Sequence, residues 1–341
     1  MEKEDIFKQL QSWTNNIPLI ILGSGASVPF RLPSMWVLGE HIKNSINFTD
    51  SHDQNQFKAF IKEFDKTGDL ESTLTKLQLR PTVLAEIVNK TWELVSKADL
   101  EAYEHFIKKD VDFPLANLLE YFLNTAGKKV SIITTNYDRL AEYASSIAKA
   151  IICNGYSQNL IGHFSNSIQS NNLASLKGYR GQVNIWKVHG SLDWFKSKED
   201  ENIQLPIRQN IPQDYSPLIV TPGLSKYSET HNEPYRTIFT QADAEIEQAN
   251  GFLCIGYGFN DIHVQPKLIT QIKNQKPIIV ITKELTQKTK QSIIDNNCQN
   301  YMLIEEANSK DTRIFSSKFG EVLIEDTRYW ELGEYLKLII S

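Results

Sequence analysis

Small residues and glycines directly follow the first apolar run of the sequence. Residues 17–22 form this run, and after it come Gly23, Ser24, Gly25, Ala26 and Ser27. Glycines let backbone N–H groups approach a phosphate, and a following helix N-terminus favours negative charge. The segment therefore predicts a nucleotide-phosphate site. Val28 replaces the third glycine of a Gly-x-Gly-x-x-Gly pattern, so a purely structural turn is an equally good interpretation.

A row of polar residues ends a later apolar run, residues 130–134. The row consists of Thr134, Thr135, Asn136, Tyr137 and Asp138. An amide side chain can bond a ribose hydroxyl or orient a water molecule, and a carboxylate can hold an amide or a hydroxyl. Helix capping is the alternative, but it needs one such residue and not a row. We therefore interpret Thr135, Asn136 and Asp138 as ligand-binding candidates.

A histidine follows the next apolar run, residues 183–188. His189 precedes Gly190 at the predicted strand exit, whereas the other histidines lie in helical or polar loop contexts. A histidine titrates near neutral pH and can act as a general base. For a single histidine on its own, a structural role is the more frequent alternative.

A second glycine turn follows residues 252–255. It consists of Gly256, Tyr257, Gly258, Phe259, Asn260 and Asp261. The alternative is a strand-to-helix turn with Asn260 or Asp261 as the N-cap. All four segments come at the C-terminal ends of predicted strands, and these ends share one edge of a parallel sheet. The sequence therefore predicts that the segments gather at one crevice.

The apolar runs that carry these residues predict an α/β fold. They are short and branched, as is typical of strands buried on both faces of a parallel sheet. The runs are residues 17–22, 130–134, 183–188, 217–221, 252–255, 278–281 and 301–304. Helical periodicity separates several of them. We expect a Rossmann-like, doubly wound, mostly parallel sheet.

Two segments depart from this alternation. Residues from about 54 to 125 show amphipathic helical patterns and no strand, which predicts a helical insertion within a single domain of residues 1–341. Residues from about 155 to 182 are rich in Asn, Ser, Gln and Gly. This composition predicts a mobile loop near one edge of the site.

The composition excludes several classes of protein. The chain of 341 residues is 41% hydrophobic and 23% charged, with a net charge of -5, which gives no cationic field for direct nucleic-acid binding. No apolar run approaches the roughly 18 to 20 residues of a membrane helix, so we expect a cytoplasmic protein without membrane binding. Cys153, Cys254 and Cys298 form no Cys-x-x-Cys pair, so no cysteine zinc site is expected.

In this order, the four segments resemble the motifs of the sirtuin family. Residues 23–27 resemble its glycine-rich NAD⁺ loop, and residues 134–138 resemble its Thr-Gln-Asn-Ile-Asp motif. His189 with Gly190 is similar to its catalytic His-Gly pair, and residues 256–260 are similar to its Gly-Thr-Ser-type turn. The resemblance spans roughly residues 17–340, interrupted by the helical insertion.

The departures from sirtuin deacylases are informative. Deacylases continue the first motif as Gly-Ile-Pro-Asp-Phe-Arg, of which Pro33 is kept but Ser34, Met35 and Trp36 replace the last three positions. The four-cysteine zinc module of deacylases is also missing. With these changes the chain resembles the zinc-free sirtuin-like proteins of bacterial antiphage defence. That resemblance implies NAD⁺ hydrolysis that depletes an infected cell of NAD⁺, a form of abortive infection.

The resemblance also implies a role for each residue and a set of partners. Asn136 would position the attacking water or a ribose hydroxyl, and His189 would accept a proton. The residues that would bind NAD⁺ are Gly23, Ser24, Gly25, Ala26, Ser27, Pro33, Thr135, Asp138, Gly256, Tyr257, Gly258 and Asn260. The substrate would be NAD⁺, without zinc. The protein would be a homo-oligomer, and some members of the family assemble with a HerA-type hexameric ATPase.

Other functions stay open at this point. An NAD-dependent protein deacylase or ADP-ribosyltransferase would need a peptide groove, which the missing zinc module disfavours. A non-catalytic nucleotide-binding subunit of a defence complex would use His189 structurally. Cyclisation of ADP-ribose is an alternative to hydrolysis. A dehydrogenase is disfavoured because the third glycine and the acidic residue of the dinucleotide fingerprint are absent.

Overall fold

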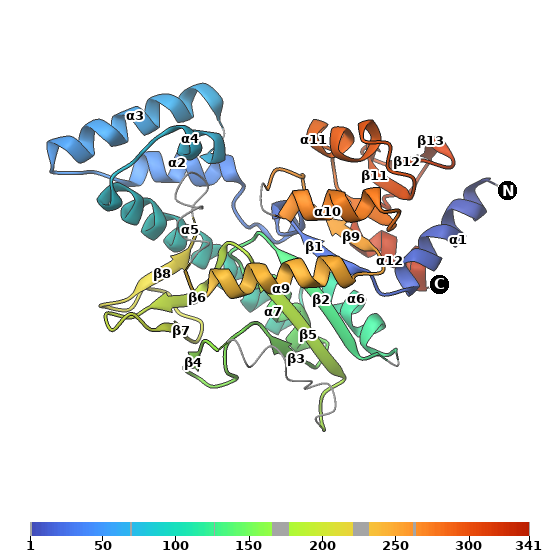
Figure 1. The fold of residues 1–341 in the computed structure, drawn as a ribbon, viewed down its shortest axis with the longest axis horizontal. Helices are drawn as coiled ribbons and strands as arrows, with labels where there is room; N and C mark the ends of the chain where they lie inside the picture. Colours follow the sequence, from blue (N-terminus) through green and yellow to red (C-terminus); the bar gives the residue numbers. More distant parts are fainter. Residues whose placement is uncertain are drawn as a thin grey trace.

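A nine-stranded sheet forms the centre of the protein (Figure 1). The computed structural model describes residues 2–68, 70–125, 127–165, 177–220, 232–261 and 264–340. The strand order is β13-β12-β11-β10-β9-β1-β2-β5-β3. The strands are β1 Leu19–Leu22, β2 Lys129–Thr134, β3 Ala150–Cys153, β5 Gly181–Lys187, β9 Phe252–Ile255, β10 Ile278–Ile281, β11 Tyr301–Asn308, β12 Asp311–Ser316 and β13 Gly320–Ile324. The strands from β11 to β3 in this order are parallel, and β12 and β13 are antiparallel.

The order of the strands reverses at β1. This strand pairs with β2 on one side and with β9 on the other. The chain first builds the sheet outward through β2 and β5, and later returns to the far side of β1 as β9. In open α/β sheets, ligands bind beyond the carboxyl ends of the strands at such a switch point. The segments that follow β1 and β9 therefore lie where a ligand site is expected.

Helices cover both faces of the sheet. Successive side chains of a strand point to opposite faces, and Ile20 and Ile21 accordingly belong to two different apolar clusters. The first cluster includes residues of α1 Glu2–Asn15, α6 Pro114–Leu123, α7 Leu140–Ile147 and α12 Leu332–Ile340. The second includes residues of α9 Tyr235–Gln248, α10 Val264–Lys273 and the π-helical turn Gln291–Asp295 that follows α11 Gln287–Lys290. The sheet is doubly wound and mostly parallel, which confirms the predicted fold class.

A helical lobe stands at one end of the sheet (Figure 1). Its own apolar cluster holds residues of α2 Met35–Ser45, α3 Ser51–Thr67, α4 Leu70–Lys76 and the first part of α5 Pro81–Lys108. The predicted helical stretch of residues 54–125 contains helices and connecting loops, and no strand occurs in the part of it that the structure describes. Within that stretch, α6 packs into the main core and not into the lobe. The single-domain organisation stays a prediction.

A second, four-stranded antiparallel sheet has the order β4-β7-β6-β8. Its strands are β4 Gly162–His163, β6 Gly190–Lys196, β7 Asn202–Gln204 and β8 Ser216–Ile219. The prediction that residues 217–221 join the parallel sheet is therefore wrong, and Thr221 lies outside the described residues. Gly190 lets the chain turn from β5 of the parallel sheet into β6 of the antiparallel sheet. It has a φ of 84°, and a Cβ there would lie 1.9 Å from Leu218 O.

The predicted mobile loop and the expected absence of a membrane helix can be compared only with the described residues. The predicted mobile loop of residues 155–182 includes residues 166–176, which lie outside the described part of the chain, so its mobility stays a prediction. On its N-terminal side, Tyr156 forms an antiparallel bridge with Phe164. Among the helices that the structure describes, none has the length and apolar character needed to span a bilayer.

Candidate functional site

The two glycine turns pack backbone against backbone at the carboxyl ends of β1 and β9. Gly25 N donates to Gly256 O at 3.0 Å, and Gly23 N donates to Ile255 O at 3.1 Å. A Cβ on Gly23 would lie 2.4 Å from Gly256 O, and a Cβ on Gly256 would lie 2.2 Å from Ala26 N. Since no side chain fits in such a contact, part of the glycine requirement is structural.

The first glycine turn forms a short 3-10 helix, η1 Ser24–Ala26, and a second one, η2 Val28–Phe30, follows it. Ala26 N donates to Gly23 O and Ser27 N donates to Ser24 O, each at 3.0 Å. Ser24 and Gly25 are exposed. A phosphate bound at this turn would therefore face Ser24 and Gly25, while several N–H groups of the turn are already hydrogen-bonded within the fold.

Gly256→Ala is expected to lower the free energy of unfolding by roughly 2 to 4 kcal/mol, from left-handed strain plus overpacking. Gly256 has a φ of 58°, and the methyl group of an alanine there would meet the backbone of Ala26. Urea unfolding measures the loss. Gly320→Ala is the matched control, because Gly320 has a φ of 69° but open space around its Cβ position. Equal losses in the two variants would show that the close packing of the turns contributes nothing.

Asn136 joins the end of β2 to the first glycine turn. Its Nδ2 donates to Gly23 O at 2.9 Å and to Ser27 Oγ at 3.0 Å. Its neighbour Thr135 is half-buried and donates from its backbone N to Leu22 O at 3.3 Å. The Asn136 side chain is thus in direct contact with the turn, and the first two predicted segments lie together.

Asp138 makes a second link to the same turn. Ser27 Oγ donates to Asp138 Oδ2 at 2.7 Å, and Leu140 N donates to Asp138 Oδ1 at 3.2 Å. The second bond reaches the first residue of α7, but Arg139 at the N-cap of that helix makes no side-chain capping bond. Burial raises the pKa of the Asp138 carboxyl, against the opposing effects of Lys187 and Ser27. Lys187 Nζ donates to the carbonyl oxygen of Asp138.

His189 lies in the turn between β5 and β6. The turn begins beside the end of β2, because Val188 N donates to Thr134 O at 3.1 Å. His189 Nε2 lies 2.7 Å from Asp261 Oδ2, and both side chains are buried. The two atoms are in close contact without the alignment of a hydrogen bond. A carboxylate in this position can hold the imidazole ring in one orientation.

Asp261 belongs to the second glycine turn and completes a ring of contacts. Asp261 Oδ1 accepts from Val264 N at 2.9 Å, which confirms the N-cap alternative for this residue. Because β1 and β2 lie between β9 and β5 in the sheet, the contact of Asp261 with His189 spans the ends of both strands. We call the two glycine turns together with Asn136, His189 and Asp261 the strand-end ring. Sequence reasoning placed Asp261 in a turn but missed its contact with His189.

The rest of the second glycine turn combines the buried side chains of Tyr257 and Phe259 with the exposed side chain of Asn260. The Tyr257 side chain is buried against Phe259, with ring centroids 5.0 Å apart, so its ring belongs to the core beneath the turn. Gly258 O accepts from Thr286 Oγ1 at 2.8 Å. Asn260 is exposed. Of these predicted contacts, Asn260 and the turn backbone are the groups that a ligand can reach.

Pro33 precedes the helical lobe. It is half-buried in the segment between η2 and α2. Ser34 Oγ accepts from Val37 N at 3.4 Å and caps α2, and Trp36 in the first turn of that helix is exposed. The segment that departs from the deacylase motif therefore begins the helical lobe, and a contact of Pro33 with NAD⁺ stays a prediction.

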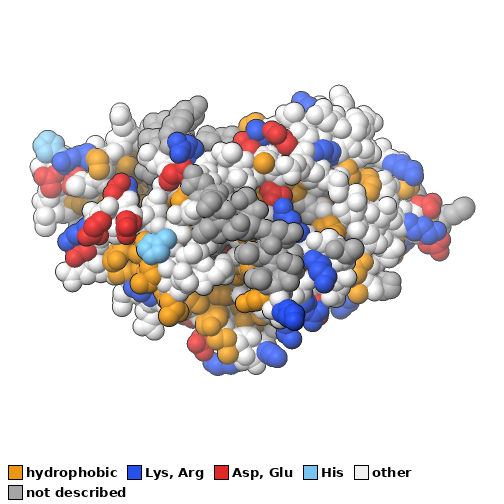
Figure 2. All heavy atoms as spheres, turned by 60° about the horizontal axis from the view of Figure 1, so that its bottom comes forward, with side chains coloured by type: hydrophobic (Ala, Val, Ile, Leu, Met, Phe, Trp, Pro, Cys, Tyr) orange, Lys and Arg blue, Asp and Glu red, His pale blue; other side chains and the backbone are white. Residues whose placement is uncertain are grey.

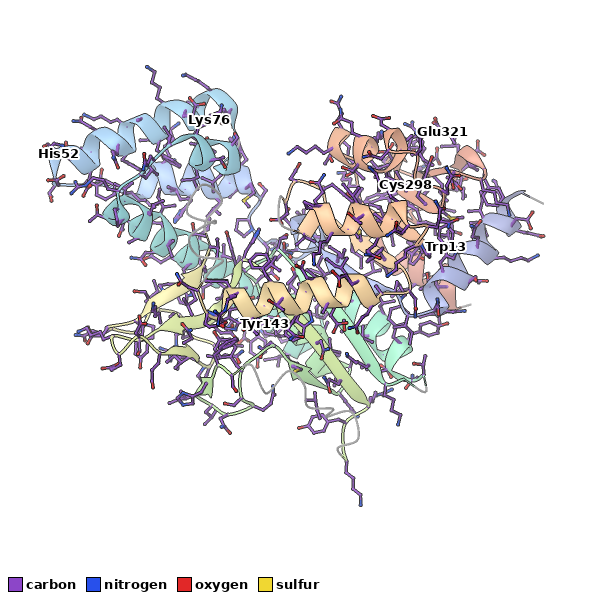
Figure 3. The ribbon with its side chains drawn as sticks, in the orientation of Figure 1. Trp13, His52, Lys76, Tyr143, Cys298 and Glu321 are labelled. Atoms are coloured by element: carbon purple, nitrogen blue, oxygen red, sulfur yellow. The ribbon has the colours of Figure 1, made fainter. Side chains whose placement is uncertain are left out.

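The three cysteines are distributed over separate parts of the fold. Cys153 lies in β3 at one edge of the main sheet, and Cys254 lies in the central strand β9. Figure 3 shows Cys298 and Glu321 at the end of the molecule opposite His52 and Lys76 of the helical lobe. All three cysteines are buried. The cysteines are therefore not placed to bind one metal ion together.

Sequence comparison identifies the family. Residues 130–313 match the sequence profile of the SIR2-like domain, which is more than half of the 341-residue chain. The chain therefore belongs to the family of SIR2-like domain proteins. The match includes Asn136, His189 and the second glycine turn, whereas the first glycine turn lies ahead of it. No curated protein sequence matches the chain.

Solved structures of Sir2 proteins are similar to the chain at low identity. A Sir2 homologue in complex with NAD is 14% identical, with 88% of this chain and 87% of that chain covered and a TM-score of 0.46. A mutant Sir2 homologue in complex with ADP-ribose is 16% identical, with coverages of 84% and 87% and a TM-score of 0.45. Sir2Tm bound to a propionylated peptide is 13% identical, with coverages of 84% and 89% and a TM-score of 0.42. The family assignment accordingly rests on the sequence match.

Proposed function

We propose that the protein is an NAD⁺ hydrolase that releases nicotinamide and ADP-ribose. The observation that carries the proposal is the strand-end ring, in which an amide, an imidazole and two glycine turns meet at the switch point of the sheet. Membership of the SIR2-like domain family supports NAD⁺ as the substrate. The lack of the four-cysteine zinc module in the sequence supports hydrolysis over deacylation.

The proposed reaction adds water across the N-glycosidic bond of NAD⁺. As this bond breaks, positive charge develops on the ribose, and nicotinamide leaves as a neutral base because its ring nitrogen is cationic in NAD⁺. Asn136 positions the water or a ribose hydroxyl, and His189 accepts the proton that the water loses. The first glycine turn and Asp138 hold the dinucleotide so that the reacting atoms stay in place.

The contact between His189 and Asp261 closes the strand-end ring. With 2.7 Å between His189 Nε2 and Asp261 Oδ2, a water or a ribose hydroxyl reaches this nitrogen only if Asp261 moves aside. We propose that this arrangement is a resting state. It fits a cytoplasmic antiphage defence effector that depletes NAD⁺ only after a trigger, as a homo-oligomer or with a HerA-type ATPase. That biological role rests on the family resemblance of the sequence.

Asn136→Ala is expected to lower kcat/KM for NAD⁺ hydrolysis by roughly 100-fold, the usual cost of removing one positioned polar group from a reacting centre. Chromatography of NAD⁺ incubated with the protein, alone and with a HerA-type ATPase, measures nicotinamide and ADP-ribose. Asn124→Ala is the matched control, because Asn124 is exposed and its Oδ1 accepts only from Arg180 at 3.2 Å among the bonds described.

The same assay separates the alternatives. Nicotinamide release that occurs only after an acylated peptide is added would favour a deacylase. Binding of ADP-ribose by calorimetry, without turnover in the complete assembly, would favour a non-catalytic subunit. Full activity of Asn136→Ala would remove the site assignment.

A further inference from the structure

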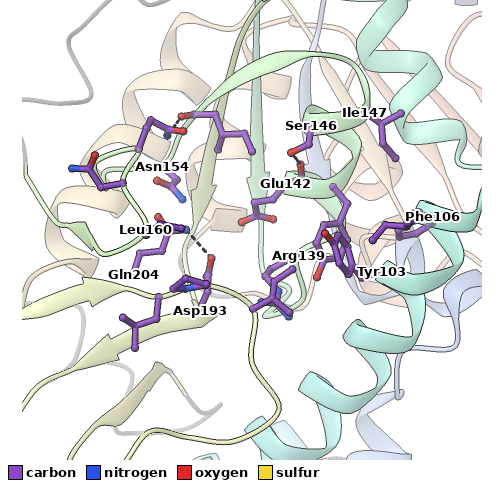
Figure 4. A pocket seen from close by; sticks show the side chains of 18 of the residues that line it. Tyr103, Phe106, Arg139, Glu142, Ser146, Ile147, Asn154, Leu160, Asp193 and Gln204 are labelled. Carbon is purple, nitrogen blue, oxygen red and sulfur yellow. Dashed lines mark hydrogen bonds between the residues drawn. The ribbon is translucent and has the colours of Figure 1, made fainter.

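A cavity lies between α7 and the small sheet. Its volume is about 740 Å³, within the range of pockets that hold small-molecule ligands. Side chains from α5, α7, the segment after β3 and the segment around β7 line it (Figure 4). None of the lining residues belongs to the strand-end ring. The cavity is therefore a separate place for a ligand, and nothing in the proposed NAD⁺ reaction uses it.

Two buried carboxylates form one wall of this cavity. Figure 4 shows Glu142 of α7 and Asp193 of β6 facing the same space. Glu142 and Asp193 are each 7% exposed. Asp193 Oδ2 accepts from Gln204 Nε2 at 2.7 Å, but Asp193 Oδ1 and both Glu142 oxygens accept no hydrogen bond from the described part of the chain. Buried polar atoms normally have partners, so these oxygens are placed for a donor from outside.

The charges around the carboxylates do not balance. The buried cations of this cluster are Arg139 and Lys187, and the buried carboxylates are Asp99, Asp138, Glu142 and Asp193. Arg139 is already bound to Asp99, with Nε 3.0 Å from Oδ2. Lys187 donates to the carbonyl of Asp138, and its Nζ lies 3.3 Å from Glu142 Oε1. Among these six buried groups the carboxylates outnumber the cations by four to two. Arg139 and the exposed Lys109 also line the cavity, but Arg139 is occupied by Asp99.

The other walls are apolar and aromatic. Tyr103, Phe106 and Tyr143 line the cavity together with Ile147 and Leu160, which are 49% and 83% exposed. Figure 2 shows hydrophobic side chains gathered on the face that is turned forward, on the side where Figure 1 has β4 and β7. Aromatic faces attract cations and also cover apolar bodies. The cavity thus joins an acidic wall to a surface suited to a ring or an alkyl chain.

We propose that this cavity binds a small organic cation, with its amidinium or ammonium group against Glu142 and Asp193 and its apolar body against the aromatic wall. The two carboxylates would supply the acceptors, and the ligand would supply the positive charge that the cluster lacks. The proposal is independent of NAD⁺, and its test uses no nucleotide.

The protonation of Glu142 gives this site a pH dependence. Burial raises the pKa of Glu142 to about 7, and Lys187 of β5 opposes this shift. Asp193 of β6 and Asp138 before α7 act in the same direction as burial, and Arg139 also faces the cavity. A cation binds the ionised carboxylate more strongly than the neutral acid, so affinity rises with pH through this pKa. We expect a roughly tenfold gain from pH 6 to pH 8.

Benzamidine is a suitable probe, and benzamide is its neutral control of nearly the same shape. Calorimetry on the full chain is expected to show one benzamidine site, with at least about tenfold weaker binding of benzamide. Asp193→Asn is expected to weaken benzamidine binding by at least about tenfold while it keeps an acceptor for Gln204. Glu142→Gln is expected to do the same and to abolish the pH dependence.

The exposed carboxylate Asp110 provides the control substitution. It pairs with His105 outside the lining of the cavity, so Asp110→Asn is expected to leave benzamidine binding unchanged. Circular dichroism of each variant shows that it is folded, and Asp193→Asn remains a test if Glu142→Gln leaves Lys187 too poorly paired to fold. The proposal is overturned if benzamidine fails to bind the wild type at millimolar concentration. Equal binding of benzamide, or full affinity in both cavity variants, overturns it too.

Discussion

His189→Ala is expected to reduce NAD⁺ hydrolysis by roughly 100-fold to 10,000-fold, the range typical of a lost general base. The imidazole follows the end of β5, and its Nε2 lies 2.7 Å from Asp261 Oδ2. The rate of nicotinamide release by the active assembly measures the effect. KM is expected to change less than kcat, because the turns that hold the dinucleotide remain.

An exposed histidine serves as the control for this variant. His105 pairs with Asp110 at the end of α5, and His105→Ala is expected to retain full activity. The Asp261 carboxylate keeps its bond from Val264 N in His189→Ala, so the start of α10 stays capped and the fold is preserved. Wild-type rates in His189→Ala would mean that the imidazole is structural and would favour a non-catalytic subunit.

Asp99→Ala is expected to lower the free energy of unfolding by about 3 to 5 kcal/mol, because it leaves a buried charge without its partner. Asp99 is fully buried and accepts from Arg139 N at 2.7 Å, from Arg139 Nε at 3.0 Å and from Tyr143 Oη at 2.5 Å. Burial disfavours the charge on Arg139, but Asp99 more than offsets this effect and raises the pKa of the guanidinium. Urea unfolding measures the loss.

Two comparisons make this prediction specific. Asp110→Ala removes an exposed pair with His105 and is expected to cost less than about 1 kcal/mol. The double variant Asp99→Ala with Arg139→Met is expected to recover part of the loss, because no unpaired charge remains. A loss in Asp99→Ala no larger than that in Asp110→Ala would contradict the account of the buried pair. Since Arg139 follows Asp138 directly, this pair also anchors the segment beside the strand-end ring.

The strands of the parallel sheet could be predicted because each is a short run of branched apolar residues. Residues 252–255 and 278–281 coincide with β9 and β10, and the run that begins at residue 17 contains β1. Such runs are buried on both faces, which leaves a clear signal in the sequence. By contrast, β6 and β8 belong to the antiparallel sheet, which the chain enters at the turn of Gly190. The apolar run of residues 217–221 does not by itself show which of the two sheets it joins.

The gathering of these segments at one edge of the sheet could be predicted, but not the contacts between their side chains. Segments at the ends of parallel strands must share one edge of the sheet, and this rule brings Asn136 and the first glycine turn together. The contact of Asp261 with His189 spans the ends of two strands and leaves no pattern in the sequence. Lys187 was also missed, although a lysine within an apolar strand was a usable signal of a buried partner.

A crystal structure of the His189→Ala protein with NAD⁺ tests the central claim most directly. The account predicts the dinucleotide beyond the carboxyl ends of β1 and β9, in contact with Asn136 and the exposed part of the first glycine turn. Its nicotinamide ribose is expected beside the position of the removed imidazole. NAD⁺ bound elsewhere, or a ribose remote from both Asn136 and residue 189, would contradict it.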